Sequence, residues 1–190
     1  MSPILLIPGL ICTADLFSPQ IPGLWSQGPV TVASTLEGET VADMAAAILR
    51  DAPPRFALGG LSMGGYIALE IVRQAPERVV KLALLDTSAR PDTPEATERR
   101  RGQIARATDG EYEAVMAGIL PNLLHPDHRA DADLIERMAQ MGRVVGPDGF
   151  ARQQGAIIGR IDSRPFLPSI RVPTLVLVGD QDGVTPPEHA

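Results

Sequence analysis

The sequence contains little of what several classes of protein need. Its 190 residues include a single cysteine, Cys12, which excludes an intrachain disulfide framework and a cysteine-based zinc site. Aromatic residues make up only 4% of the chain, so a cofactor pocket built on ring stacking is not expected, and we predict no cofactor. No apolar run approaches the ~20 residues that are needed to span a bilayer, so we expect no membrane-spanning segment.

Basic charge is also scarce. The formal net charge is -6, whereas a protein that binds a nucleic-acid backbone needs a basic surface, so we expect no nucleic-acid partner. Residues 4–11 are apolar, but no basic segment precedes them and Pro8-Gly9 interrupts them, which makes them a poor signal peptide. The sequence therefore predicts a cytoplasmic protein, and nothing in it indicates the oligomeric state.

Short apolar segments alternate with amphipathic ones along the chain. The content of 44% hydrophobic and 21% charged residues is typical of a globular fold. Because the apolar segments show no polar alternation, we expect the strands of an α/β protein, buried on both faces of a mostly parallel sheet with flanking helices. The expected strands are residues 4–7, 30–33, 56–61, 79–85 and 172–178, and the expected helices between them include 40–49 and 64–74.

The middle of the chain, residues 90–165, contains no convincing strand and shows helical spacing instead. Ligands of open α/β sheets bind beyond the carboxyl ends of the strands, so we interpret this block as a helical cap over that end of the sheet. We therefore expect one domain, residues 1–190, with a cap at about residues 90–165 inserted between the fourth and fifth strands. The helices expected in the cap are residues 95–107, 109–120, 132–141 and 147–161.

Residues 60–65 read Gly-Leu-Ser-Met-Gly-Gly and contain the G-x-S-x-G pattern of a nucleophile elbow. Between a strand and a helix, this pattern makes a sharp turn that presents the Ser62 hydroxyl, and its glycines avoid Cβ clashes. The amide of Met63 then lies unpaired at a helix N-terminus, where the dipole favours negative charge. We predict that Ser62 is a nucleophile and that the Met63 N–H stabilises an oxyanion. The alternative is a strand-to-helix turn with a capping serine.

Two further turns are expected at the same end of the sheet. Residues 8–10, Pro-Gly-Leu, follow the first strand, and we predict that the Leu10 amide points at the oxyanion; the alternative is an ordinary strand-ending turn. Asp182 follows the last strand, where a carboxylate can orient a histidine and stabilise its imidazolium. We expect Asp180 to shape that turn, and Asp86, at the end of the fourth strand, is the alternative acid.

These segments together resemble the α/β-hydrolase fold superfamily, in its branch of small esterase- and lactonase-like enzymes with a helical cap. The resemblance implies Ser62 as the nucleophile, Asp182 as the triad acid, and the amides of Leu10 and Met63 as the oxyanion hole. It implies hydrolysis of a small-molecule substrate, a carboxylic ester, lactone or thioester, through an acyl-enzyme on Ser62, with no metal and no cofactor. The segments that carry it are residues 6–10, 60–65, 86–88 and 173–182, which follow the family's order along nearly the whole chain.

The sequence departs from the family's pattern at the triad histidine. The resemblance implies that this histidine follows a further strand, ~30 residues or more beyond the acid, whereas only eight residues follow Asp182. His125 and His128 lie in the expected cap, and His189 lies too close to Asp182 to face Ser62. We therefore predict that the chain is truncated at its C-terminus, without the last strand and helix, and that its histidine lies beyond Ala190.

Two functions follow from this prediction. The first is a serine hydrolase whose 190-residue chain is weakly active or inactive, because a serine hydroxyl without a base is a poor nucleophile. The alternative is a non-catalytic α/β-hydrolase-like protein that binds a ligand or a partner. The sequence does not choose between ester, lactone and other substrates, because one fold supports many reactions.

Overall fold

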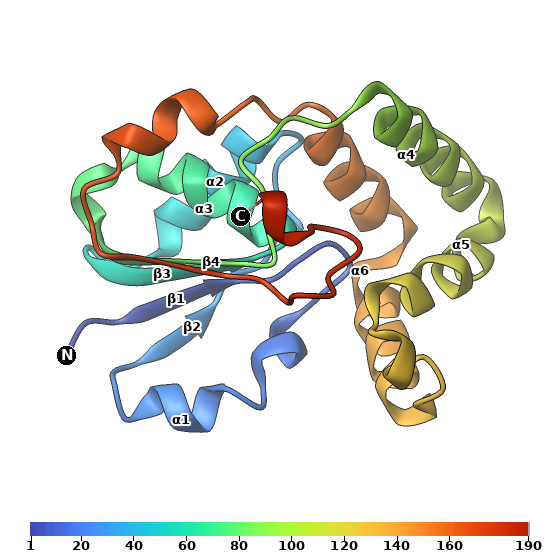
Figure 1. Cartoon of the computed structure of the whole chain (residues 1–190), viewed down its shortest axis with the longest axis horizontal. Helices are drawn as coiled ribbons and strands as arrows, with labels where there is room; N and C mark the ends of the chain where they lie inside the picture. The colour runs from blue at the N-terminus through green and yellow to red at the C-terminus, as the bar shows by residue number, and fades with distance from the viewer. Residues whose placement is uncertain (190) are drawn as a thin grey trace.

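The computed structural model describes residues 1–189, and its centre is a five-stranded parallel sheet (Figure 1). The order across the sheet is β2-β1-β3-β4-β5, and every neighbouring pair is parallel. This arrangement confirms the predicted α/β fold with a parallel sheet and flanking helices. The strands are β1 (Ile4–Ile7), β2 (Val30–Val32), β3 (Phe56–Leu61), β4 (Val79–Leu85) and β5 (Thr174–Leu177).

Two helices, α2 (Val41–Asp51) and α3 (Met63–Gln74), cover one face of the sheet, and α1 (Ile21–Trp25) lies on the other side (Figure 1). Helix α2 begins at a capping box. The Thr40 hydroxyl accepts a hydrogen bond from the Asp43 amide at 3.0 Å, and the Asp43 carboxylate accepts one from the Thr40 amide at 3.1 Å. This reciprocal pair satisfies two N–H groups that the first turn leaves free, so the chain enters the helix immediately after Thr40.

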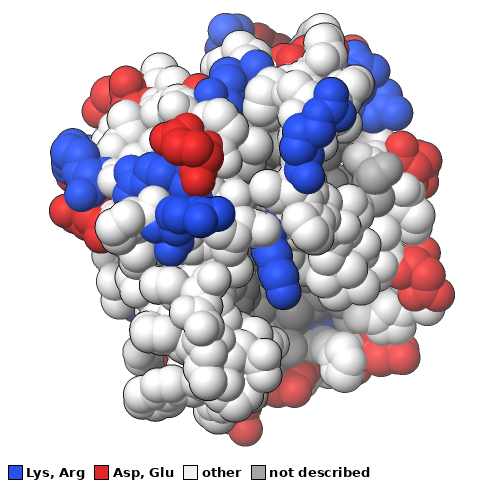
Figure 2. All heavy atoms as spheres, turned by 90° about the vertical axis from the view of Figure 1, so that its left-hand side faces the viewer, with Lys and Arg blue, Asp and Glu red and all other residues white. Residues whose placement is uncertain are grey.

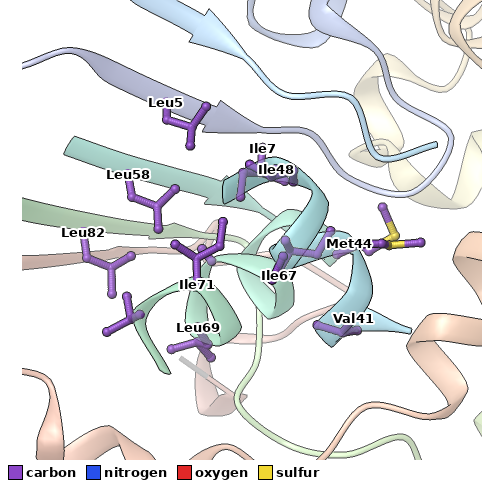
Figure 3. Packing of buried hydrophobic residues seen from close by; sticks show 14 of the residues in the cluster. Leu5, Ile7, Val41, Met44, Ile48, Leu58, Ile67, Leu69, Ile71 and Leu82 are labelled. Atoms are coloured by element: carbon purple, nitrogen blue, oxygen red, sulfur yellow. The ribbon is translucent and has the colours of Figure 1, made fainter. Parts of the chain in front are cut away.

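The main core lies between the sheet and these two helices. In Figure 3, Ile48 of α2 and Ile71 of α3 lie beside the strand residues Ile7 and Leu58, and all four belong to one cluster of buried hydrophobic residues. Ile7 and Ile71 are completely buried. Burial of each such side chain contributes roughly 1.5–3 kcal/mol, so this packing fixes the helices on the sheet.

The chain between β4 and β5 is helical. It contains α4 (Pro94–Arg106), α5 (Tyr112–Ile119) and α6 (Ala132–Ile158), which lie together to the right of the sheet in Figure 1. Residues 132–141 and 147–161, expected to form two helices, fall in the single element α6, which ends at Ile158, three residues before the expected end. A kink at Gly146, where φ is 68°, still separates its two arms. Because Pro147 lacks an amide hydrogen, the regular hydrogen bonding is interrupted there.

These helices have a small core of their own, which includes Ile11 from the loop after β1. The ring of Tyr112 lies 5.8 Å from that of Phe150, and its hydroxyl donates a 2.6 Å hydrogen bond to the Gly142 carbonyl. Burial raises the pKa of Tyr112 to about 12. The cluster consists of Ile11, Ala107, Tyr112, Val115, Met116, Leu120 and Phe150. The side chain of Ile11, from the loop after β1, is therefore packed among helices of the segment between β4 and β5.

Asp92, in the loop between β4 and α4, forms a buried ion-pair network beside these helices. Its carboxylate is 3% exposed and lies 3.2 Å from the Arg100 guanidinium and 2.8 Å from that of Arg160. Arg100 also donates to the Gln154 side chain at 2.6 Å. Burial lowers the pKa of Arg100, although the neighbouring Asp92 charge opposes the shift. A buried carboxylate shared by two cations thus connects α4 to the segment that follows α6.

Strand β5 differs from the expectation of a sheet buried on both faces. Leu175, Val176 and Leu177 are 55%, 48% and 56% exposed. The strand is also shorter than expected, because pairing with β4 begins only at Thr174. Within residues 1–189, β5 is the edge of the sheet, so side chains of both orientations face outward. The expectation of burial on both faces is wrong at this strand.

Charge is unevenly distributed over the surface. Figure 2 shows one face, on which Lys and Arg side chains gather in the upper half and the lower half is mostly uncharged. No helix within residues 1–189 combines the length and apolar character needed to cross a membrane. The same residues contain no group of three or more His, Cys, Asp or Glu side chains arranged to hold a metal ion.

Candidate active site

Ser62 lies at the corner where β3 ends and α3 begins. Its φ of 54° and ψ of -117° form a conformation that residues other than glycine rarely adopt. The Ser62 amide donates to the Leu85 carbonyl at 2.9 Å, and the Ser62 carbonyl accepts from the Gly65 amide at 2.9 Å and the Thr87 hydroxyl at 2.7 Å. These bonds fasten the strained turn to β4 and the loop after it, while the serine itself is only partly buried.

The glycines of the motif allow an unusually close approach of backbones. A Cβ atom on Gly60 would lie 2.2 Å from the Gly64 carbonyl oxygen, and one on Gly64 would lie 2.1 Å from the Ile7 carbonyl oxygen. Both distances are far below van der Waals contact. The two glycines therefore let α3 start directly against β3 and the end of β1.

The turn after β1 lies against Ser62. A Cβ atom on Gly9 would be 3.4 Å from the Ser62 Cβ, and the Cys12 amide closes the turn with a 3.2 Å bond to the Gly9 carbonyl. Neither the Leu10 amide nor the Met63 amide donates a hydrogen bond within residues 1–189. Met63 is the first residue of a 12-residue helix, where free N–H groups and the dipole favour an anion. Both predicted donors therefore belong to turns that meet at Ser62.

Gln153, on α6, contacts this turn and was not singled out by the sequence. Its side-chain oxygen accepts a 2.9 Å hydrogen bond from the amide of Ile11, the residue after Leu10. Gln153 is completely buried. The only sequence signal is its place in a helical segment, and a single glutamine there does not indicate which loop it binds.

Asp182 lies in the turn after β5, where local hydrogen bonds to its carboxylate favour the ionised form. Its carboxylate accepts from the amides of Val184 at 2.7 Å and Thr185 at 2.9 Å, and from the Thr185 hydroxyl at 2.7 Å. Partial burial raises the pKa of Asp182, but these bonds outweigh it and leave the pKa below the usual value of 3.8. The alternative acid, Asp86, accepts a 3.0 Å bond from the Gly179 amide and so joins β4 to the end of β5.

The lowered pKa of Asp182 predicts an effect on acid stability. Since the folded pKa is below the unfolded one, the ionised carboxylate stabilises the fold above pH ~4, and this contribution disappears as the pH falls through the lowered value. We expect the unfolding free energy of Asp182→Asn to decline less steeply than that of the unaltered chain below pH ~4, measured by urea titration. Asp180→Asn, in the same turn, is the control. If the unfolding free energies of the unaltered chain and of Asp182→Asn declined in parallel below pH ~4, the lowered pKa of Asp182 would be contradicted.

The three histidines lie apart from this arrangement. His125 Nε2 is 2.9 Å from the side-chain oxygen of Gln181, and its Nδ1 accepts from the Asp127 amide at 3.3 Å. The His128 ring lies 6.3 Å from the His125 ring. His189 lies in the short helix Pro187–His189. Within residues 1–189, no histidine ring hydrogen-bonds to Ser62 or Asp182, so the structure does not assemble a complete triad.

Comparisons with known proteins agree with the geometry. A sequence profile of the alpha/beta hydrolase fold matches residues 34–190. A pimeloyl-[acyl-carrier protein] methyl ester esterase of Neisseria meningitidis serogroup C is 30% identical over 189 residues, which cover 96% of this chain and 70% of that protein. The esterase of the same description from Vibrio parahaemolyticus is 29% identical over 78% of this chain, and the match spans only 60% of its length.

Solved structures show the same fold. A thermophilic esterase from Thermogutta terrifontis superposes with a TM-score of 0.87 and 32% identity, covering 100% of this chain and 75% of the esterase. An enol-lactonase from Burkholderia xenovorans superposes with a TM-score of 0.88 over 99% of this chain and 76% of its own, at 24% identity. The second match, at this lower identity, supports the fold alone.

Proposed function

The chain belongs to the alpha/beta hydrolase fold family, and on that premise we propose that it is a serine hydrolase of small carboxylic esters, lactones or thioesters. The observation that carries the proposal is the strained backbone of Ser62, beside two turns whose amides at Leu10 and Met63 have no acceptor within residues 1–189. A strained conformation costs free energy, and it persists only where surrounding contacts hold it in place. Residues of this kind cluster at active sites.

In the proposed reaction, the Ser62 hydroxyl oxygen attacks the carbonyl carbon of the substrate and its proton passes to a base. The negative charge that develops on the carbonyl oxygen is stabilised by the N–H groups of Leu10 and Met63. Collapse of this tetrahedral species breaks the bond to the leaving alcohol or thiol, which takes up the proton and leaves an acyl group on Ser62. Water then attacks the acyl group by the same steps and releases the acid and the free serine.

We assign the acid of the triad to Asp182, which would orient an imidazole and stabilise its protonated form. The contacts of His125 with Gln181 and Asp127 occupy both of its ring nitrogens, so we do not assign it as the base. None of the chain's three histidines is proposed for that role. We therefore expect the 190-residue chain to be slow, because the Ser62 hydroxyl has no strong base to activate it.

Within this substrate class, methyl esters are the first to test. The curated relatives are described as methyl ester esterases, and a solved relative at 32% identity is an esterase.

The test is covalent labelling of the chain with a fluorophosphonate, which reacts far faster with a serine in an oxyanion-stabilising site than with an ordinary serine. We expect a single adduct on the peptide that contains Ser62, formed slowly, as measured by intact-protein and peptide mass spectrometry. A panel of methyl esters of increasing acyl length, with an enol lactone and a thioester, then identifies the preferred leaving group. If no adduct forms and no ester is turned over, the proposal fails in favour of a non-catalytic, ligand-binding protein.

A further inference from the structure

Gln153 connects three segments that are distant in the chain. Its side-chain oxygen accepts from the Ile11 amide at 2.9 Å, and its side-chain nitrogen donates to the Thr35 hydroxyl at 2.9 Å. Gln153 is completely buried, and Thr35 is 2% exposed. Both polar ends of the amide are therefore used, one on the loop after β1 and the other on the loop after β2.

The hydrogen bond that Gln153 accepts comes from the residue of the turn whose backbone is strained. Ile11 has a φ of 58°, a conformation that is an outlier for a β-branched residue. Its side chain is 2% exposed and packs in the cluster that contains Phe150. The next bond along the turn, from the Cys12 amide to the Gly9 carbonyl, lies within the turn itself. Gln153 is thus the polar contact that ties the turn to α6.

We infer that Gln153 is a positioning residue, which holds the turn of residues 9–12 in the conformation that presents the Leu10 amide to the oxyanion. The inference rests on the proposed function, because it assigns a purpose to the Leu10 N–H. The Leu10 N–H belongs to the peptide unit between Gly9 and Leu10. The Ile11 N–H that Gln153 binds belongs to the next peptide unit, and the two units share the Cα atom of Leu10. Without the bond to Gln153, the peptide unit between Leu10 and Ile11 is free to rotate. The Cα atom of Leu10 then loses its anchor, and with it the adjoining Leu10 N–H.

The variant Gln153→Met tests this, because it keeps the size of the side chain and removes both polar ends. We expect the rate of fluorophosphonate labelling to fall at least about tenfold, towards the ~10²–10³-fold that loss of one oxyanion donor produces. For a turned-over ester, we expect kcat to fall with little change in KM, because the oxyanion exists only beyond the ground state. Gln153→Glu retains acceptors for the Ile11 amide and the Thr35 hydroxyl, so it should restore most of the rate.

The neighbouring residue offers a matched control. Gln154 is 1% exposed and bonds to Arg100 and Gln103, not to the turn. Gln154→Met therefore removes a comparable buried amide without contacting residues 9–12, and we expect it to label at the unaltered rate. Amide hydrogen exchange provides a readout independent of chemistry, because Ile11 should exchange faster in Gln153→Met and not in Gln154→Met.

The outcomes separate this inference from the proposed function. If the unaltered chain labels and Gln153→Met labels equally fast, or if both glutamine variants are slowed alike, the positioning role is wrong and the hydrolase proposal stands. If the unaltered chain labels no faster than Ser62→Ala, both are wrong. Should Gln153→Met fail to fold, Thr35→Val removes only the second bond, and a smaller decrease in labelling with unchanged melting temperature is then the expected result.

Discussion

Ser62→Ala is expected to abolish both fluorophosphonate labelling and ester hydrolysis, down to the rate of the reagent in buffer. The hydroxyl is the only atom of this residue that the proposed reaction uses, since the Ser62 amide and carbonyl bond to β4, Gly65 and Thr87. We expect the variant to fold normally because those backbone bonds remain. Label on another residue, or turnover that survives in Ser62→Ala, would contradict the assignment.

Stability measurements on the same position test the strain directly. A residue held in a sparsely populated region of φ and ψ costs on the order of 1–3 kcal/mol, which glycine avoids. Elsewhere alanine is more stabilising than glycine by roughly 0.5–1 kcal/mol. At position 62 we expect the reverse, with Ser62→Gly more stable than Ser62→Ala by about 1 kcal/mol in urea titrations. The usual order of the two variants would show that the turn is not strained.

Gly64→Ala is expected to be severely destabilising. Its Cβ would lie 2.1 Å from the Ile7 carbonyl oxygen and 2.8 Å from that of Pro8. Both are backbone atoms, which cannot rotate away as a side chain can, so α3 must move off β1. We expect a loss of at least about 3 kcal/mol, or failure to fold, measured by urea titration or by soluble yield.

Gly102→Ala is the control for Gly64→Ala. Gly102 lies within α4, and a Cβ there would meet nothing within 4 Å. Alanine is favoured over glycine in an open helical position, so this variant should gain roughly 0.5–1 kcal/mol. If the two alanine variants were equally stable, the close contact of α3 with β1 would be disproved.

Much of the fold could be predicted because it depends on local patterns. The apolar run of residues 56–61 and the overlapping Gly-Leu-Ser-Met-Gly-Gly segment of residues 60–65 predict a strand, a sharp turn and a helix, and the structure places β3 and α3 there. The Thr40 cap similarly marked the start of α2 to within one residue. In each case the signal and the structure that it specifies lie within a few residues of each other.

Other features required the tertiary structure. The exposure of Leu175 and its neighbours could not be read from an apolar segment, because burial depends on what packs against the strand. Asp86 and Asp182 both follow strands, and only the fold shows that Asp86 binds the Gly179 amide whereas Asp182 forms a local turn with Thr185. The contact between His125 and Gln181 likewise joins residues that are 56 positions apart.

The sequence by itself determined most of the strand and helix segments and the turn at Ser62, since each depends on neighbours in the chain. Only the tertiary structure decided how the turn beside Ser62 is supported. Gln153 reaches Ile11 across 142 positions and Thr35 across 118, so no local periodicity encodes either bond. The physical reason is that a buried side-chain amide needs hydrogen-bond partners. For Gln153 these partners come within reach only when the helices between β4 and β5 have packed on the sheet.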